Sequence, residues 1–394
     1  MILIVPFGAM AGYLTVAVAF LLTRAGVPVG ETAALVALSY VPHTWKFLWA
    51  PIADTTLTRK SWYMIAVLVS AAGIAAIGAI PATPTGLAML SVVVFAANVA
   101  VTFLGMSVES LMAYGTPPDL KGRAAGWFQA GNLGGGGIGG GLGLWLAQKL
   151  PHPWMSGSAL GALCLLCMLA LLFLDESKAA HLQGTLLERL KFVAVDLWHV
   201  AKSRLGLLAL ILCFLPIGSG AASGLWSAVA DDWRASASTV ALVTGVGGGI
   251  VSAVGCLAGG WLCDHIDRKM AYTLYGVLQA LSAVAMALSP RTEMTYIIYT
   301  TAYAFITGLT YAGFSAFVLE AMGMGAAATK YSVFASLSNT PIAYMTSVDG
   351  WAHGKWGPGG MLYAEAVSGT IGLVLFIGVM MVAARTAPGL EANT

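Results

Sequence analysis

A lysine lies inside an apolar stretch near the start of the chain. Residues 43–56 read HTWKFLWAPIADTT, in which Lys46 stands between two tryptophans and eight residues before Asp54. In a helix, His43, Lys46 and Ala50 share one face. A buried ammonium is costly unless it is paired, so Lys46 is a candidate for binding an anionic substrate group or an internal carboxylate. The imidazole of His43, which titrates near neutral pH, is a candidate proton carrier.

A second polar stripe suggests a partner for this lysine. Asn98, Thr102 and Glu109 recur at i, i+4 and i+11 in another apolar run, which places them on one helical face. Glu109 is the best candidate for a carboxylate that takes up a proton, with Lys46 as its partner. Such a Lys–Glu pair titrates as a unit in a low dielectric. The alternative is that Glu109 belongs to a gate of ion pairs.

The amino-acid composition of the chain indicates that these residues lie in a membrane protein. The chain has 394 residues, of which 58% are hydrophobic and 9% charged, against about 25% charged in soluble domains. Its apolar runs do not alternate with polar residues, so they predict helices rather than barrel strands. The sequence therefore predicts an all-α membrane protein with twelve spans. Their approximate limits are 2–22, 32–52, 62–81, 86–113, 122–147, 154–174, 205–229, 238–262, 271–289, 294–321, 330–348 and 360–384.

The distribution of positive charge predicts an orientation. Thirteen of the nineteen Lys and Arg lie in the even-numbered connections and the C-terminus, and five in the odd-numbered connections. The excess marks the cytoplasmic side, so both termini are expected there. The longest connection, residues 175–204, contains TLLERLKFVAVDLWHV, which predicts an amphipathic interfacial helix. It divides the chain into a six-helix bundle over 1–174 and another over 205–394.

The two halves resemble each other at an offset of about 210 residues. Pro6 and Gly8 match Pro216 and Gly218, and Asp54 matches Asp264. The positions that correspond to His43 and Lys46 are Ala253 and Cys256. A device needed only to build the fold should appear in both halves. This favours a functional role for Lys46 over the alternative that its long stem reaches the cytoplasmic surface. For His43, the alternative is a hydrogen-bonded packing role.

Two further sets of residues are functional candidates. Charged residues at the cytoplasmic ends of the spans can pair with each other and with helix dipoles to hold one conformation. This predicted gate contains Asp54, Arg59, Arg123, Asp264, Arg268, Glu320 and Lys330. Additional candidates for binding the substrate are Gln129, Asn132, Trp226, Tyr311 and Asn339.

These features resemble those of a known family. Two six-helix repeats joined by a cytoplasmic linker are the architecture of the major facilitator superfamily, and GGWLCDHIDRK (259–269) is similar to its loop pattern G-x-L-x-D-x-x-G-R-K, with Asp267 in place of the second glycine. WKFLWAPIAD is similar to the K-F-L-W-[SA]-P-x-x-D signature of the AmpG-type muropeptide permeases and their relatives. The stretch from Glu109 to Ala147 is similar to the same branch, although the usual aspartate is glutamate here.

The resemblance implies a secondary transporter that imports a sizeable polar solute, such as a glycopeptide, together with protons. A related group of compact siderophore permeases shares the WKFLWAP stretch, so a siderophore or another amphipathic metabolite is an alternative substrate. An exporter and a non-transporting sensor are further alternatives. No GK[ST] follows the glycine runs 131–143 and 245–255, which excludes a phosphate loop there. We expect close helix contacts at these glycines.

Other classes of function are not indicated. The sequence contains no local hydrolase signature, so we do not expect an enzyme. It also contains no motif for a cofactor, a metal site or a nucleic-acid partner. The expected partners are the solute, protons and the lipid bilayer. The predicted location is the bacterial inner membrane, with the protein as a monomer.

Overall fold

The computed structural model describes residues 1–115, 121–174, 185, 187–188, 191, 195, 198, 202, 204–263, 265–322 and 333–385. Within these residues the protein is helical and contains no β-strand. Helix is present in each of the twelve predicted spans. Seven helical stretches of the described part are long and apolar enough to cross a membrane, and the last of them, Val333–Met381, contains two predicted spans.

The first half contains the predicted spans 1 to 6. The first span is built from η1 (Ile2–Ile4), α1 (Val5–Gly12), a π-helical turn η2 (Tyr13–Val18) and α2 (Ala19–Arg24). The next three spans are α3 (Val29–Thr55), α4 (Arg59–Ala79) and α5 (Leu87–Gly115), the last preceded by η3 (Pro84–Gly86). The fifth consists of α6 (Lys121–Gly137), η5 (Ile138–Leu142) and α7 (Gly143–Lys149), and the sixth of α8 (Trp154–Leu166) and η6 (Cys167–Phe173).

The second half contains the predicted spans 7 to 12. Its helices are interrupted after Phe214 and at Gly357. It begins with α10 (Arg204–Phe214), η7 (Ala221–Gly224) and η8 (Ala230–Trp233). The eighth span is α11 (Ala237–Val240), η9 (Ala241–Val246) and α12 (Gly247–Cys263). Helices α13 (Arg268–Leu288), α14 (Glu293–Met322) and α16 (Asn339–Arg385) complete it.

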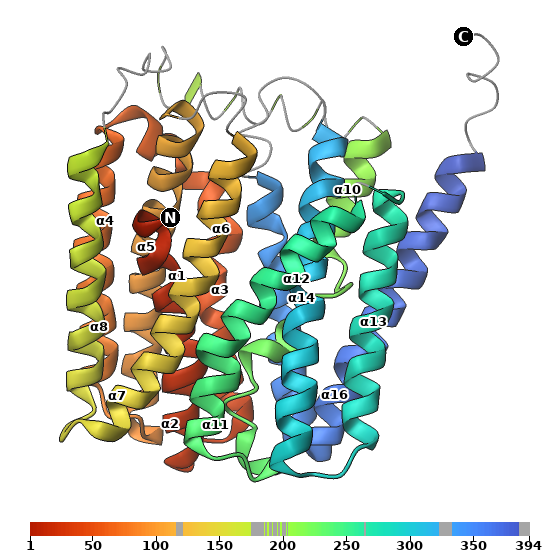
Figure 1. Ribbon diagram of the computed structural model, residues 1–394. Coiled ribbons are helices and arrows are strands. Elements are labelled where there is room, and N and C mark those ends of the chain that lie inside the picture. The colour runs from red at the N-terminus through yellow and green to blue at the C-terminus, as the bar shows by residue number, and fades with distance from the viewer. Residues whose placement is uncertain are drawn as a thin grey trace.

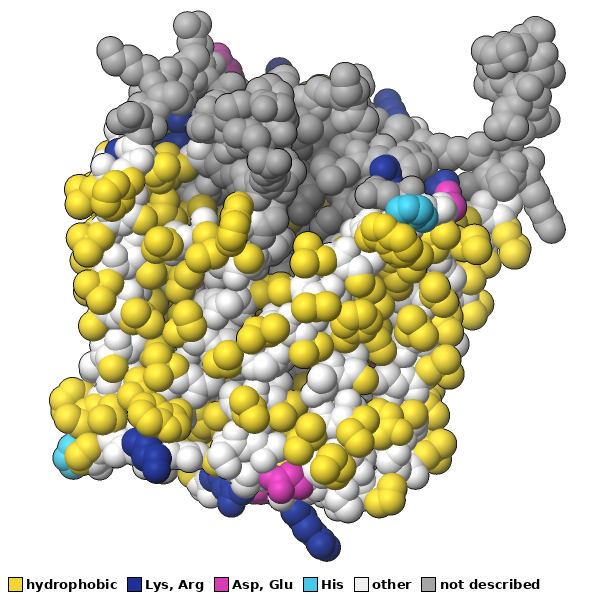
Figure 2. All heavy atoms as spheres, viewed as in Figure 1, with side chains coloured by type: hydrophobic (Ala, Val, Ile, Leu, Met, Phe, Trp, Pro, Cys, Tyr) yellow, Lys and Arg dark blue, Asp and Glu magenta, His cyan; other side chains and the backbone are white. Residues whose placement is uncertain are grey.

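The helices form two groups that lie side by side (Figure 1). Helices α1 to α8 make up one group and α10 to α16 the other, and α12 crosses obliquely between them next to α6. Hydrophobic side chains cover the middle of the visible face, and charged side chains gather towards its two ends (Figure 2). This is the surface that a protein embedded in a bilayer requires. The linker 175–204 lies mostly outside the described residues, so the exact division into two bundles stays a prediction.

The seventh predicted span, 205–229, is not one continuous helix, as Pro216 and the glycines after it lead one to expect. Helix α10 ends at Phe214, and the chain then runs through irregular turns and short 3-10 segments to residue 236. Pro216 lacks the amide proton that a helix needs. Gly218 and Gly220 adopt φ values of +57° and +69°, which are left-handed conformations that glycine tolerates best.

Buried tyrosines satisfy the backbone carbonyls that this break releases. Tyr272 of α13 donates to the Ile217 carbonyl at 2.8 Å, and Tyr296 of α14 donates to the Trp226 carbonyl at 2.8 Å. Both tyrosines are almost fully buried. Irregular backbone at membrane depth is tolerated only when protein groups or water complete its hydrogen bonds. The neighbouring helices therefore stabilise the broken span.

The last two predicted spans are joined without a long loop. They form the two arms of α16, which is interrupted at Gly357, where φ is +69° and Pro358 follows. This break turns the chain back, so that the two arms form a hairpin.

Part of each glycine run lies where the two halves meet, as expected, and other glycines of the runs pack against helices of their own half. A Cβ atom added at Gly245 of η9 would lie 2.6 Å from the Cα atom of Gly141 in η5. Only glycine allows two helical backbones to approach so closely. The eighth and fifth spans are thus in direct backbone contact across the two groups.

Candidate functional site

Helices α3 and α5 carry the two polar stripes that the sequence analysis identified, and the structure joins them. His43 Nε2 and Asn98 Oδ1 are 3.2 Å apart, and Trp49 donates its indole N–H to Thr102 Oγ1 at 3.0 Å. Lys46 Nζ lies 3.2 Å from Glu109 Oε1. Each of the three residues of the α5 stripe therefore has a side-chain partner on α3.

The Lys46–Glu109 pair lies inside the protein. The Lys46 side chain is 8% exposed and that of Glu109 is 33% exposed. Lys46 therefore does not reach the lipid or the aqueous surface, and the predicted pairing with Glu109 is present. An ion pair with one buried and one partly accessible partner can exchange a proton with water through the accessible carboxylate.

His43 is buried beside this pair. It is 9% exposed, and the ring of Phe7 packs edge-on against it with centroids 5.2 Å apart. Asn98 Oδ1 can only accept, and Asn98 Nδ2 donates to the Val94 carbonyl, so His43 donates this hydrogen bond from its Nε2–H. The contacts fit a packing role as well as a proton-carrying role, so both interpretations of His43 stay open.

The additional substrate-binding candidates are dispersed. Gln129 and Asn132 of α6 are hydrogen-bonded to each other at 3.4 Å, and Asn339 donates to the Ala335 carbonyl at 2.8 Å. Tyr311 on α14 is 49% exposed, whereas Trp226 in the broken seventh span is only 3% exposed. Among the described residues, no hydrogen bond or ion pair links these side chains to Lys46 or Glu109. Their binding role stays a prediction.

The predicted cytoplasmic gate falls largely outside the described part of the structure. The structure does not describe Asp264 and Lys330, nor the side chains of Asp54, Arg123 and Glu320. Arg59 and Arg268 are the first residues of α4 and α13. The gate therefore stays a prediction.

The two halves are joined at the opposite end of the molecule. Arg24, at the end of α2, forms an ion pair with Asp231 of η8 at 2.7 Å. Ser227 donates a hydrogen bond to the Thr15 carbonyl, and Ala19, Val36 and Ala228 form a small buried cluster. These contacts connect the first two spans with the broken seventh span and close this end.

The sequence analysis missed two acidic residues in the last two spans. Asp349 and Glu365 lie on the two arms of α16 and are 0% and 5% exposed. Acidic residues inside apolar spans are themselves a signal of function, and this signal was present in the sequence.

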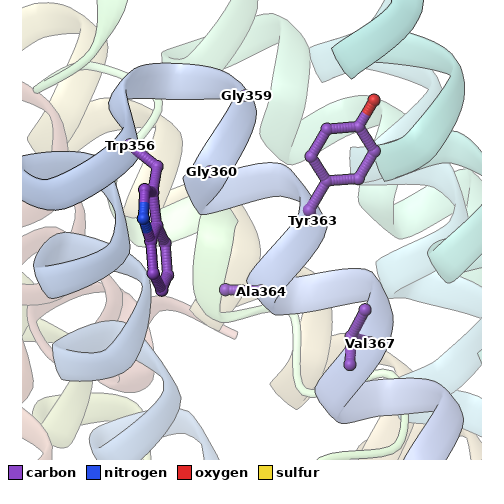
Figure 3. A pocket seen from close by; sticks show the side chains of 6 residues that line it. All are labelled: Trp356, Gly359, Gly360, Tyr363, Ala364 and Val367. Atoms are coloured by element: carbon purple, nitrogen blue, oxygen red, sulfur yellow. The ribbon is translucent and has the colours of Figure 1, made fainter.

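A groove at the bend of α16 is not part of this interior. It is lined by Trp356, Gly359, Gly360, Tyr363, Ala364 and Val367 (Figure 3). Trp356, Tyr363 and Val367 are all exposed. The groove therefore lies on the outer surface of the helix, whereas Glu365 in the same turn is buried.

Comparison with known proteins agrees with this architecture. The family model of the Major Facilitator Superfamily matches residues 1–346. Anhydromuropeptide permease of Escherichia coli strain K12 is 25% identical over 376 residues, covering 87% of this chain and 71% of that protein.

Solved transporters share the fold. The inward-open xylose transporter XylE from E. coli has a TM-score of 0.69 at 11% identity, with 100% of this chain and 96% of that chain covered. The nucleoside transporter NupG has a TM-score of 0.70 at 15% identity, with 96% of each chain covered. The chain belongs to the Major Facilitator Superfamily, a family of membrane transporters rather than enzymes.

Proposed function

We propose that this protein is a proton-coupled importer of a sizeable polar solute with muropeptide-like chemistry, working by alternating access. One observation carries the proposal, namely the interior ion pair between Lys46 and Glu109 at 3.2 Å. A charge at the centre of a membrane helix costs about 2.5 to 3.5 kcal/mol on insertion scales. The second half of the chain has Cys256 in place of the lysine. The pair is therefore not required by the repeated fold.

The exposure of the two side chains suggests how the pair works. Glu109 is the more accessible partner, so a proton reaches its carboxylate first. Protonation removes the charge that holds Lys46, and the freed ammonium can then bind an anionic group of the solute. When Glu109 loses the proton, it recaptures Lys46 and the solute is released. Binding of proton and solute is coupled because both act on the same ammonium.

Alternating access requires a gate at each end. The Arg24–Asp231 contact closes one end in this structure. We propose that the predicted cytoplasmic gate closes the other end when the transporter changes conformation; it consists of Asp54, Arg59, Arg123, Asp264, Arg268, Glu320 and Lys330. The charge distribution supports an orientation with these residues and both termini in the cytoplasm of the bacterial inner membrane.

The relationship to anhydromuropeptide permease supports the substrate class. A muropeptide carries carboxylates that suit Lys46, together with sugar hydroxyls and amides. Gln129, Asn132 and Asn339 could bind these polar groups, and Trp226 and Tyr311 could stack on the sugar rings.

Uptake into vesicles tests this proposal. The full-length protein is reconstituted in lipid vesicles, and labelled anhydro-muropeptide is added under an imposed pH gradient that is alkaline inside. We expect accumulation that a protonophore abolishes. Glu109→Gln should abolish accumulation but retain exchange of labelled for unlabelled solute, because it cannot bind and release the proton. Glu31→Gln, on the exposed first turn of α3, is the matched control.

Three results would contradict the proposal. Binding without accumulation would indicate a sensor. Uptake of a ferric siderophore but not of muropeptide would assign the alternative substrate class. Unchanged proton-driven uptake by Glu109→Gln would remove Glu109 from the coupling mechanism.

A further inference from the structure

Asp349 and Glu365 face each other across the hairpin of α16. Each lies eight residues from Gly357, one before it and one after it. With a rise of 1.5 Å per residue, both lie about 12 Å from the turn along their helical arms. The two carboxyl groups are therefore at the same depth, and they are in contact.

The hydrogen bonds around this pair are incomplete. Glu365 Oε1 accepts hydrogen bonds from the Tyr303 hydroxyl at 2.6 Å and from Ser219 Oγ at 3.2 Å. Glu365 Oε2 and both oxygens of Asp349 have no donor among the described residues. Asp349 is completely buried. A buried carboxylate without any donor carries a large free-energy penalty.

The surroundings supply no compensating positive charge. The titratable side chains that the structure places against the pair are Tyr303 of α14, which donates to Glu365, and Tyr344 of α16 itself, and His353 lies one helical turn after Asp349. His353 is bound to Asp232 at 2.7 Å. In the described part of the chain, no lysine, arginine or histidine forms an ion pair with Asp349 or Glu365.

We propose that Asp349 and Glu365 form a second proton-binding site, in which the two carboxyl groups share one exchangeable proton. Two carboxylates in contact inside a low dielectric cannot both be ionised. Glu365 accepts two hydrogen bonds on Oε1, so it is the acceptor, and Asp349 carries the proton. A hydrogen bond donated by the O–H group of Asp349 to Glu365 Oε2 gives that oxygen the donor it lacks. The exchange is a simple transfer of H⁺ between water and a carboxylate.

Two observations favour a functional pair over a packing feature. The corresponding spans of the first half contain no acidic residue between positions 120 and 174. The repeated fold therefore does not require these carboxyl groups. Their partner Ser219 also belongs to the broken seventh span, between the left-handed Gly218 and Gly220.

The seventh span provides a physical link to conformational change. Trp226 packs edge-on against Tyr303 with ring centroids 5.2 Å apart, and its buried indole N–H has no acceptor among the described residues. Loss of the shared proton would leave two anions that need new donors. The free indole N–H of Trp226, which packs on the Tyr303 ring that binds Glu365, is a candidate for such a donor on a backbone that is not locked in a helix. The protonation state of the pair therefore biases the conformation of residues 215–236, which contact the first half at the closed end. This role in coupling rests on the proposed proton-driven transport.

Infrared spectroscopy of the full-length protein in lipid vesicles tests the site without any solute. At neutral pH we expect the C=O band of a protonated carboxyl group. The band should shift in D₂O and disappear at alkaline pH. Asp349→Asn should remove the titrating band, because Glu365 keeps two hydrogen-bond donors and can stay ionised. Glu365→Gln leaves the buried Asp349 protonated, so the band should stay but change its frequency and its titration midpoint. Glu31→Gln should leave the band unchanged. Ser219→Ala retains both carboxyl groups, so it should keep the band but shift its frequency through the lost hydrogen bond.

Several outcomes would overturn the inference. One is the absence of the band in the unmodified protein, and another is its persistence in Asp349→Asn. A band that neither exchanges in D₂O nor titrates would show a closed structural pair. A band that Na⁺ removes at constant pH would show a sodium site. If the variants do not fold, the exchange and titration of the unmodified protein decide alone. Because no solute is present, failure of this test is distinguishable from failure of muropeptide uptake.

Discussion

Lys46 and Glu109 show how helical spacing alone can identify a contact between two polar side chains inside the protein. The two stripes on the second and fourth spans predict which faces carry polar groups, and the structure brings those faces together at three points. For Asp349 and Glu365, the sequence shows two acidic residues in apolar surroundings but not their contact. Their contact depends on where the hairpin turns, and only the position of Gly357 in the folded chain makes their depths equal.

Replacing one partner of the Lys46–Glu109 pair should lower the free energy of unfolding more than replacing both partners. Lys46→Met leaves an uncompensated carboxylate and should lower the free energy of unfolding. The loss should be smaller than the roughly 3 to 5 kcal/mol typical of fully buried pairs, because Glu109 is one-third exposed. The double variant Lys46→Met, Glu109→Gln should recover part of this loss. Thermal unfolding in detergent measures it, with Lys149→Met as the exposed control. Equal or additive losses would show that the two residues do not interact.

Glu293 gives a pH-dependent contact at the solvent-exposed start of α14. Its Oε1 accepts hydrogen bonds from Thr239 Oγ1 at 2.5 Å and from the Ser236 backbone N–H at 3.0 Å. The bonds from Thr239 and Ser236 hold the pKa of this carboxyl below its usual value. A lowered pKa means that the stabilisation is present above the unfolded-state pKa and is lost as the pH falls through the folded-state pKa.

Acidification should therefore loosen the connection between Glu293 and α11. Hydrogen exchange of the amides of residues 236–240 should become faster, beyond the intrinsic pH effect, as the pH falls through this range. Glu293→Gln should remove most of that dependence. A Glu293→Gln profile that matches the unmodified protein would contradict this assignment.

At the scale of helices, the sequence predicts where spans lie better than how they are interrupted. Pro6 and Gly8 align with Pro216 and Gly218, yet α1 continues as a helix while the seventh span breaks. In the first span, Gly8 lies against the Asn132 backbone of α6, so its glycine serves close packing. In the seventh span, tyrosines from α13 and α14 satisfy the open backbone. These tertiary partners decide between helix and break, and a repeat pattern does not contain them.

The contact between η5 and η9 should tolerate no side chain. In Gly245→Ala, the new Cβ would lie 2.6 Å from Cα and 2.7 Å from N of Gly141, which are backbone atoms that cannot rotate away. We expect a loss of about 1 to 3 kcal/mol, as for other overpacked sites, and slower transport. Gly260→Ala on α12 is the matched control, because no atom lies within 4 Å of its added Cβ. The stability of both variants is measured by thermal unfolding, and their transport rate by uptake into vesicles. Equal stability and equal transport rates of Gly245→Ala and Gly260→Ala would exclude a close contact at Gly245.

At the scale of the whole molecule, Arg24 and Asp231 form an ion pair between the two halves at one end of the protein. The ion pair joins the two halves, and its side chains are 49% and 56% exposed. Exposed ion pairs contribute about 0 to 1 kcal/mol. A free-energy change of about 1 kcal/mol alters a two-state ratio roughly fivefold. A weak pair is therefore sufficient to shift the balance between two conformations, although it contributes little to folding.

Removing this pair should populate the conformation that is open at the Arg24 end. Arg24→Ala should increase the long-distance fraction between spin labels placed on the α7–α8 connection and the α13–α14 connection, by up to about fivefold. The charge-reversed double variant Arg24→Asp, Asp231→Arg should restore the original distribution, because the attraction is re-formed with opposite polarity. High salt should mimic Arg24→Ala in the unmodified protein, since exposed charges are screened. Distances that are unchanged in both Arg24→Ala and high salt would show that the apolar contacts of Ala19, Val36 and Ala228 alone hold this end closed.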